Sequence, residues 1–374
     1  MNQKTQKINQ FQKIDTNHED IIHDIAFDYY GKKLATCSTD RSVKIYQKSS
    51  NGEWKQINSI TNQDGPVWKV KWAHPEFGNI LAACSMDRYI NIYEENRDFN
   101  QKDQSKKNNQ KYNKYVYKIN KDKQGTWRNT QIYDNESIED MKFGPKHLGL
   151  ILAIARADGI IRIFMFKDML NLQIQEKITE INITKLGINS ISWSKNRFDK
   201  PMIAIGCKDF NTSQIKHYCN VYGNTIKMPE EVEKSECFQI YAINIIANQQ
   251  KLNQQIKIYP DETKQNEFLH SQAVNDVSWS LHNGKSFHLI GTCGKEGAIV
   301  WYLKNLEENQ LQVLQKVILN YNLEVEVWKI SWNLSGQLVS TTDSAEEMNV
   351  YQSKGIGQWQ NVKTVKLYQD EIYF

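Results

Sequence analysis

The chain contains six copies of one short sequence pattern, and this repetition limits the folds open to it. Each copy has an aliphatic residue, two variable residues, an aliphatic residue or Met, one variable residue and an aromatic residue. The copies are IHDIAF (22–27), VWKVKW (67–72), IEDMKF (138–143), INSISW (188–193), VNDVSW (274–279) and VWKISW (327–332). Such self-similarity indicates a structure that grows by repeated addition of one small unit. A length of 374 residues, above the usual size of a single compact core, favours the same conclusion.

Each copy is followed by the same succession of segments. A second apolar run rich in small residues comes next, for example LATCS at 34–38. A turn with an acidic residue and a segment ending in an aromatic residue, for example VKIY at 43–46, usually complete the unit. Short segments rich in β-branched and aromatic residues, separated by turns, are typical of antiparallel meanders. No part of the unit has helical periodicity, so the sequence predicts an all-β fold.

A single small sheet cannot bury both of its faces, whereas several sheets packed face to face around an axis can. We therefore predict a single β-propeller domain, residues 1–374, with six blades. After Tyr351 the chain continues only to residue 374, which leaves room for one more strand and no seventh repeat. The ring either closes by pairing residues 7–14 with the last blade, or stays open. The approximate repeats are 18–60, 61–133, 134–183, 184–270, 271–318 and 319–374.

Composition excludes several classes of function. The 47 basic and 43 acidic residues give a net charge of +4, far from the concentrated basic field of a nucleic-acid-binding protein, so we expect no direct nucleic-acid partner. No segment reaches the roughly eighteen consecutive apolar residues of a membrane span, and we expect no secretory leader. Any membrane association is expected to be indirect. The six cysteines include no C-x-x-C pair and are expected to be free thiols, most of them in the core.

Two connections are longer than the repeat requires. Residues 96–125 are dominated by Asn, Gln, Lys and Asp, and we expect a mobile, solvated insertion. An RNA-contacting arm is the alternative, but the aromatic residues are few and the charges are mixed. Residues 224–269 contain CFQIYAINII and QQIKIY, which we expect to be outer strands of the fourth blade and a lead into the fifth.

Several longer stretches resemble the WD-repeat family, and more narrowly the SEH-type nucleoporins, which are relatives of the Sec-thirteen coat subunit. They include NHEDIIHDIAFDYYGKKLATCSTDRSVKIY, VWKVKWAHPEFGNILAACSMDR, FGPKHLGLILAIARADGIIRIF, KDMLNL, PMIAIG, GKSFH and VWKISWNLSG. The WD dipeptide itself is absent. The resemblance implies six WD-repeat blades that do not close, with a further blade donated in trans by a helical-solenoid nucleoporin.

The same resemblance implies a non-enzymatic scaffold subunit of the Y-shaped nuclear pore subcomplex, located at the nuclear envelope. Other coat-complex subunits are then expected as further partners. A related coat-like complex that controls nutrient signalling at the vacuole or lysosome is a second expected location. A Sec-thirteen-type role in vesicle coats is the nearest alternative. An alternative from a different functional class is a receptor propeller that binds peptides or substrates on its rim.

The second position of the six-residue pattern breaks strict strand alternation, so we expect a bulge there that turns the side chain toward the rim of the propeller. Two of these residues are Trp, a frequent hot-spot residue, so the set would suit peptide binding. The alternative is that each Trp packs over the neighbouring blade. We call this set the rim residues: His23, Trp68, Glu139, Asn189, Asn275 and Trp328.

His18 precedes the first repeat where, by resemblance, WD repeats carry a structural His. Ser38 and Asp40 stand where its hydrogen-bonding partners are expected, and Tyr46 replaces the Trp of the family. The role implied is a buried structural network rather than catalysis. Asp87 and Asp158 occupy the same turn position as Asp40, where a carboxylate can accept backbone N–H bonds.

His74, Cys84 and Asp87 lie close together in the sequence, which raises the question of a metal or nucleophile site. Such a site needs a further His or carboxylate from elsewhere, and we expect these residues to be structural. The chain also has no phosphate-binding glycine loop, nucleophile elbow or zinc-protease motif. The sequence therefore predicts no enzyme, no cofactor and no metal.

Overall fold

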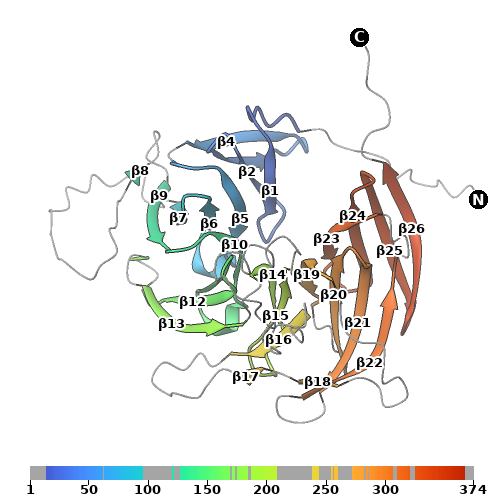
Figure 1. Ribbon diagram of the computed structural model, residues 1–374. Helices are drawn as coiled ribbons and strands as arrows, with labels where there is room; N and C mark the ends of the chain where they lie inside the picture. The colour runs from blue at the N-terminus through green and yellow to red at the C-terminus, as the bar shows by residue number, and fades with distance from the viewer. Residues whose placement is uncertain are drawn as a thin grey trace, which may run out of the picture.

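The computed structural model of the chain is a ring of six small antiparallel sheets around a central axis (Figure 1). The six-bladed, all-β fold predicted from the repeats is thereby confirmed. No helix in the described part of the chain is long and apolar enough to cross a membrane. The structure describes residues 14–61, 63–95, 120–121, 127–168, 171–172, 175–183, 187–208, 238–243, 254–255, 257–259, 272–281, 284, 286–305, 310–320 and 325–366.

Each blade has four strands that follow chain order from the axis outward. The innermost strands are β1 (Ile22–Phe27), β5 (Val67–Trp72), β10 (Ile138–Phe143), β14 (Ile188–Trp193), β19 (Val274–Trp279) and β23 (Val327–Trp332). The second strands are β2 (Lys33–Ser38), β6 (Ile80–Ser85), β11 (Ile151–Arg156), β15 (Met202–Cys207), β20 (His288–Gly294) and β24 (Leu338–Asp343). The chain passes once around the ring, so blades 1 to 6 are numbered in chain order.

The third strands are β3 (Val43–Lys48), β7 (Tyr89–Glu95), β12 (Ile160–Phe166), β16 (Phe238–Ala242), β21 (Gly297–Asn305) and β25 (Glu347–Gly355). The outer strands are β4 (Trp54–Ile60), β9 (Trp127–Tyr133), β13 (Gln175–Asn182), β17 (Gln254–Gln255), β22 (Gln310–Ile318) and β26 (Gln358–Lys366). Two short 3-10 helices, η1 (Pro75–Phe77) and η2 (Lys146–Leu148), follow β5 and β10.

Two further short strands extend the outer edges of blades. β8 (Asn120–Lys121) pairs with β9 and belongs to the predicted insertion at 96–125, whose other residues lie outside the described part. β18 (Lys257–Tyr259) pairs in parallel with β22 of blade 5, which makes that sheet five-stranded. The segment QQIKIY is thus shared between blades, because β17 extends blade 4 and β18 extends blade 5.

The six-residue pattern coincides with the innermost strand of every blade. In each blade the pairing with the second strand shifts register between the first and third positions of the pattern, as between Ile22 and Asp24 in β1. This irregularity lies where the sequence predicts a bulge. The first and fourth positions consequently face the neighbouring blade, where strict alternation would turn them to opposite faces.

Apolar packing between consecutive blades forms the core. The second strand divides its side chains between both neighbours: in β6, Leu81 and Ala83 pack toward blade 1, whereas Ile80, Ala82 and Cys84 pack toward blade 3. Each later blade offers the first and fourth residues of its innermost strand to the blade before it. Five such interfaces join blades 1 to 6.

The cysteines that the structure describes form no disulfide and are buried within these interfaces, as the sequence predicts. They are Cys37, Cys84, Cys207 and Cys293. Burial raises the pKa of the Cys84 thiol to about 12. A thiol in that state behaves as a small apolar group and is a poor nucleophile.

Polar contacts near the axis accompany the apolar packing. Asp140 accepts the backbone N–H of Ile191 in the next blade at 3.0 Å. Burial alone would raise the pKa of Asp140, but Lys142, Lys69 and Lys71 outweigh that effect and lower it to about 2. The carboxylate is therefore charged, and a charge-assisted bond crosses the boundary between the two blades. Asp24 and Asp276 make the same bond, to the N–H groups of Val70 and Ile330.

Close packing between blades 4 and 5 depends on Gly206 in β15. A Cβ atom there would lie 2.8 Å from Cγ1 of Val274 and 2.9 Å from Cγ2 of Val277. We expect Gly206→Ala to lower the free energy of unfolding by about 1–3 kcal/mol, because two β-branched side chains cannot move aside easily. Denaturant unfolding monitored by tryptophan fluorescence measures this change.

The matched control is Gly355→Ala, since a Cβ at Gly355 would meet only the side chain of Gln358 at 3.9 Å. That substitution should change the free energy of unfolding by less than about 0.5 kcal/mol. Combining Gly206→Ala with Val277→Ala should recover part of the loss. Equal stability of the two single variants would contradict the packing argument.

Candidate functional site

The rim residues mostly form contacts from one blade to the next. His23 and Trp68 stack with their ring centroids 4.3 Å apart, which joins blades 1 and 2. The Glu139 carboxylate lies 2.8 Å from Nζ of Lys208 in blade 4. The side-chain amides of Asn189 and Asn275 donate to backbone carbonyls of the following blade, at 3.0 and 3.1 Å. The second position of the pattern is therefore an inter-blade joint.

Trp68 and Trp328 differ in their surroundings although both occupy the rim position. Trp68 is half-buried against the apolar core between blades 2 and 3. Trp328, in blade 6, is 51% exposed. The two tryptophans proposed for peptide binding are therefore not equivalent, and only Trp328 presents a largely free ring.

The innermost strand of blade 1 is exposed where the other innermost strands are buried. Residues at the first and fourth pattern positions of blades 2 to 6 have exposed fractions between 0% and 3%. Their counterparts Ile22 and Ile25 are 38% and 55% exposed, and Phe27 is 55% exposed. We call Ile22, Ile25 and Phe27 the β1 edge. Strands β1, β2 and β3 otherwise pair in the same register as their equivalents, so the exposure results from the neighbourhood of the blade.

Blade 6 differs at the positions of β24 that would pack against a following blade. These are Leu338, Ser340 and Thr342, which correspond in the strand pairing to Ile80, Ala82 and Cys84 of blade 2. Met348 and Val350 lie opposite Thr342 and Ser340 on β25. All five are half-buried. We call these five residues the forward face of blade 6. On this face, the hydroxyl-bearing Ser340 and Thr342 stand where blade 2 has the small apolar residues Ala82 and Cys84.

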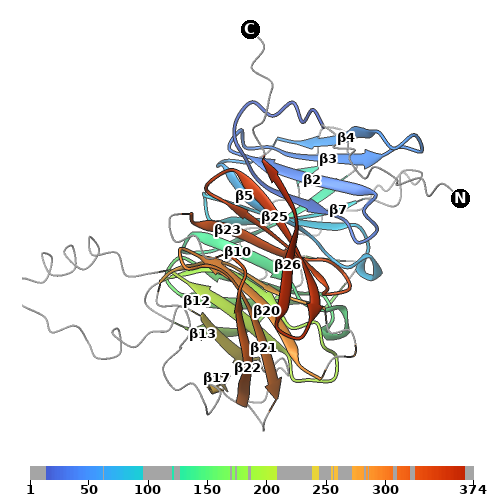
Figure 2. The same ribbon diagram turned by 90° about the vertical axis from the view of Figure 1, so that its right-hand side faces the viewer.

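The β1 edge and the forward face of blade 6 lie at the same sector of the ring. Figure 1 shows blades 1 (blue) and 6 (red) on either side of this sector, and Figure 2 views it from the side of blade 6. Among the described residues, no strand pairing and no buried apolar cluster joins the two blades. An axial cavity of about 1340 Å³ is lined by residues of both, including Ile25, Phe27, Ile330 and Met348, and also by residues of the other four blades.

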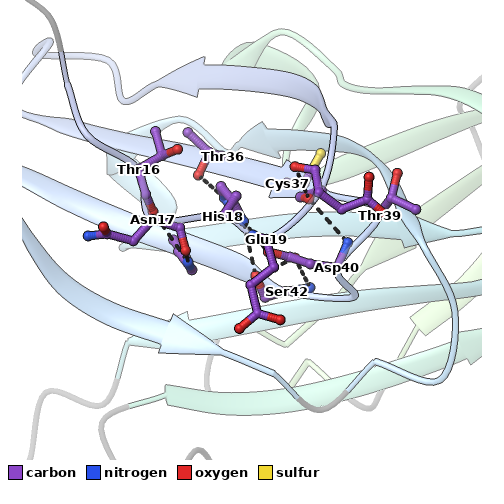
Figure 3. Close-up of polar contacts among 12 residues, drawn as sticks. Thr16, Asn17, His18, Glu19, Thr36, Cys37, Thr39, Asp40 and Ser42 are labelled. Carbon is purple, nitrogen blue, oxygen red and sulfur yellow. Dashed lines mark hydrogen bonds and ion pairs between the residues drawn. The ribbon is translucent and has the colours of Figure 1, made fainter. Parts of the chain in front are cut away.

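The predicted network around His18 joins the segment before β1 to the second strand of blade 1 and to the turn that follows this strand (Figure 3). Nδ1 of His18 is 2.6 Å from Asp40, and Nε2 is 2.8 Å from the hydroxyl of Thr36. The Tyr46 hydroxyl donates to the Thr16 carbonyl at 2.7 Å. The structure thus joins His18 with Asp40, while its hydroxyl partners are Thr36, two residues before Ser38 on β2, and Ser42, whose Oγ lies 3.2 Å from Nδ1.

Ser38 belongs to the neighbouring turn. Its hydroxyl donates to the carbonyl of Asp20 at 3.0 Å and accepts the N–H of Asp40 at 3.1 Å. Asp87 and Asp158 act in turns of the same kind, because each accepts the N–H of the residue two positions later, at 3.2 and 3.3 Å. Their carboxylates therefore stabilise the connections between second and third strands.

The segment with His74, Cys84 and Asp87 has no geometry of a metal centre. His74 accepts the N–H of Glu76 through Nδ1 at 3.2 Å and so begins η1. Cys84 is buried in the core. No group of three or more His, Cys, Asp or Glu side chains within the described ranges could hold a metal ion.

Sequence reasoning missed two groups that matter for the site. The first is the β1 edge, whose residues have the same chemical character as their buried counterparts. The second is the set of axial carboxylates, Asp24, Asp140 and Asp276, which bond the next blade. The third position of the pattern, polar in every copy, was the signal that could have found these carboxylates.

The repeat, the ring of four-stranded sheets and the turn carboxylates define a WD-repeat β-propeller. Residues 9–47 and 54–94 match the family model described as WD domain, G-beta repeat. Individual proteins of one more specific family match nearly the whole chain. Nucleoporin SEH1 of Xenopus tropicalis is 30% identical over 366 residues, covering 94% of this chain and 87% of the relative. The human protein of that name is 29% identical, with coverages of 92% and 85%. The chain belongs to the SEH1 nucleoporin family.

Stability should depend on pH through His18. Burial lowers the pKa of His18, although the hydrogen bond and charge of Asp40 oppose this. The unfolded chain therefore takes up a proton more readily, and stability is lost as the pH falls below about 6.5. We expect the stability advantage of the wild type over His18→Gln to be smaller at pH 5 than at pH 7. Urea unfolding at both pH values tests this, and an advantage that grows on acidification would contradict it.

Proposed function

We propose that this chain is a non-enzymatic scaffold subunit of the nuclear pore coat and that its ring is open between blades 1 and 6. A helical-solenoid nucleoporin then completes the ring by donating a blade. The observation that carries the proposal is the 55% exposure of Ile25, at a position that is buried in every other blade. Phe27 is also 55% exposed, whereas the aromatic residues at its position in the other blades are buried or half-buried. The membership of the chain in a nucleoporin family supports the location at the nuclear envelope.

The β1 edge supplies a driving force for this assembly. Complete burial of a side chain such as Ile25 or Phe27 contributes about 1.5–3 kcal/mol, before the cost of ordering the partner is subtracted. Blades 1 to 5 each pack the second strand against the innermost strand of the next blade. A donated blade would therefore present small apolar residues to the β1 edge, as β6 presents Ile80, Ala82 and Cys84 to blade 3.

The other side of a donated blade would meet blade 6. Its innermost strand would lie against Leu338, Ser340 and Thr342, so a mixed apolar and hydrogen-bonding surface suits this contact better than a purely aliphatic one. Trp328 would then contact the donated blade, because the preceding rim residues contact the blade that follows them. A buried Trp at such a joint is a common hot spot.

The same open sector is compatible with two further settings. A coat-like nutrient-signalling complex at the vacuole or lysosome, or a vesicle coat of the Sec-thirteen type, would use it with a different helical partner. The peptide-receptor alternative depends on the rim residues as a set. Because Glu139, Asn189 and Asn275 are already engaged in inter-blade contacts, the rim offers that alternative less support than the β1 edge offers ours.

Substituting Ile25→Glu together with Phe27→Glu should lower recovery of the helical nucleoporin with the tagged chain at least tenfold. Two carboxylates at the β1 edge would be buried without partners in the assembled ring. Trp328→Ala should weaken the same complex, with a loss of about 1–2 kcal/mol in binding free energy. Quantitative affinity purification, followed by titration of the purified pair, measures both effects.

The matched control is Ile57→Glu with Leu314→Glu, which changes exposed apolar residues on the outer strands β4 and β22. Recovery of the partner should then equal that of the wild type. Full recovery with the Ile25 and Phe27 variant, or hydrogen exchange of β1 that is unchanged when the partner binds, would overturn the proposal of a donated blade.

A further inference from the structure

The loops that follow the innermost strands gather on the face opposite the rim residues. The innermost strands all run in the same direction along the axis, so each begins at the rim and ends at this second face. A six-residue strand separates the two faces by roughly 20 Å. We call this second face the exit face, formed by residues 28–32, 73–79, 144–150, 194–201 and 333–337.

The axial cavity of about 1340 Å³ includes much of the exit face in its lining. Two carboxylates line it, and both have partners: Asp24 pairs with Lys71, and Asp276 accepts bonds from Ser190 and from the Ile330 N–H. The cationic side chains of the lining outnumber them and are Lys142, Lys146, Lys195, Arg197 and Lys329. The mouth of the cavity is therefore positive although the whole chain is almost balanced in charge.

Two of these cations have no anionic partner. In the part of the chain that the structure describes, neither Lys195 nor Arg197 forms an ion pair with a carboxylate; Arg197 lies 5.5 Å from the ring of Phe198, and its charge also acts on His147. Desolvation, followed by the charge of Lys142, lowers the pKa of Lys195. Lys142 itself lies 3.6 Å from Asp140. Lys195 and Arg197 are exposed to solvent, and an anion bound there would relieve the repulsion between Lys195 and Lys142.

Exposed apolar side chains border the same mouth. Phe198 and Leu334 are 85% and 80% exposed, and Tyr29 is 67% exposed. Tyr29 packs edge-on against His74 with the ring centroids 4.8 Å apart. All three line the cavity together with Leu281. Large apolar groups beside free cations provide anchors for a ligand that carries both carboxylates and apolar side chains.

Lys329 belongs to blade 6, but Lys142, Lys146, Lys195 and Arg197 belong to blades 3 and 4, across the ring from the sector between blades 6 and 1 (Figure 1). A blade donated at that sector would therefore leave them accessible. They also converge on one cavity and do not form a groove that could follow a nucleic-acid backbone. Apolar anchors of both aliphatic and aromatic type favour a peptide over stacked bases.

We propose that the mouth of the axial cavity on the exit face binds an extended acidic peptide segment of a partner protein. Carboxylates of the segment lie against Lys142, Lys195 and Arg197. An aromatic or aliphatic side chain of the segment packs against Phe198, which is 85% exposed beside Arg197. The cations of this site lie on blades 3 and 4, whereas the β1 edge, which lines the same cavity, belongs to blade 1.

Fluorescence anisotropy with the full chain tests this site. The probe is a fluorescein-labelled peptide of repeated Glu-Glu-Phe, compared with repeated Lys-Lys-Phe, with a Glu-only peptide and with labelled oligothymidylate of the same length. We expect the Glu-Glu-Phe peptide to bind most tightly and Lys195→Glu with Arg197→Glu to weaken it at least tenfold. Raised salt should weaken binding as well, since the attraction is between partly exposed charges.

The matched control is Lys55→Glu with Lys304→Glu, which makes the same charge change at exposed positions on β4 and β21. Affinity for the peptide should then stay within twofold of the wild type. Equal weakening by both pairs, tighter binding of oligothymidylate, or no binding of the acidic peptide would each overturn the proposal. Lys195→Ala with Arg197→Ala, confirmed as folded by thermal unfolding, repeats the test without introducing new carboxylates.

Recovery of the helical nucleoporin should be unchanged by Lys195→Glu with Arg197→Glu. The peptide site and the open sector can therefore fail independently. Loss of both activities in this variant would mean that the two surfaces are one, which contradicts the inference.

Discussion

The apolar contact between each blade and the next is the constraint on which the rest of the structure depends. The second strand of one blade covers the first and fourth positions of the following innermost strand, and five interfaces repeat this arrangement. Since no blade buries both faces by itself, the first and last blades each keep one face without a partner from the described chain. The exposure of Ile25 beside the complete burial of Val70 follows directly from this order.

Polar contacts of two kinds run in chain order between blades, from a side chain of one blade to the backbone of the next. Near the axis, Asp140 accepts the N–H of Ile191. At the rim, the side-chain amide of Asn189 donates to the carbonyl of Val274. These bonds lie at either end of the apolar layer and fix how far one blade slides along its neighbour. In blade 6 the corresponding side chains have no following blade, which leaves Trp328 exposed.

The innermost strands could be predicted from the sequence because their pattern is local, including the bulge at its second position. The solvent exposure of those strands could not be predicted in the same way, because it depends on which blades lie next to each other. Ile25 and Phe27 have the same apolar character as Val70 and Trp72, and only the absence of a covering sheet exposes them. The pairing of His18 with Thr36 rather than Ser38 depends on where the preceding loop crosses β2, which is a tertiary property. Pairing of β18 with blade 5 is likewise set by the path of a long connection.

The asymmetry between the two sides of the open sector favours a partner sheet over closure of the ring on itself. The β1 edge keeps the aliphatic and aromatic residues of an ordinary interface, whereas the forward face of blade 6 carries Ser340 and Thr342 where blade 2 carries Ala82 and Cys84. In direct contact, these hydroxyls would be buried against Ile25 and would lose hydrogen bonds to water. A sheet inserted between the two can match each side separately, with small apolar residues toward β1 and polar groups toward β24. The two flanks therefore differ in chemistry, and the donated blade that we propose would meet each of them with a different face.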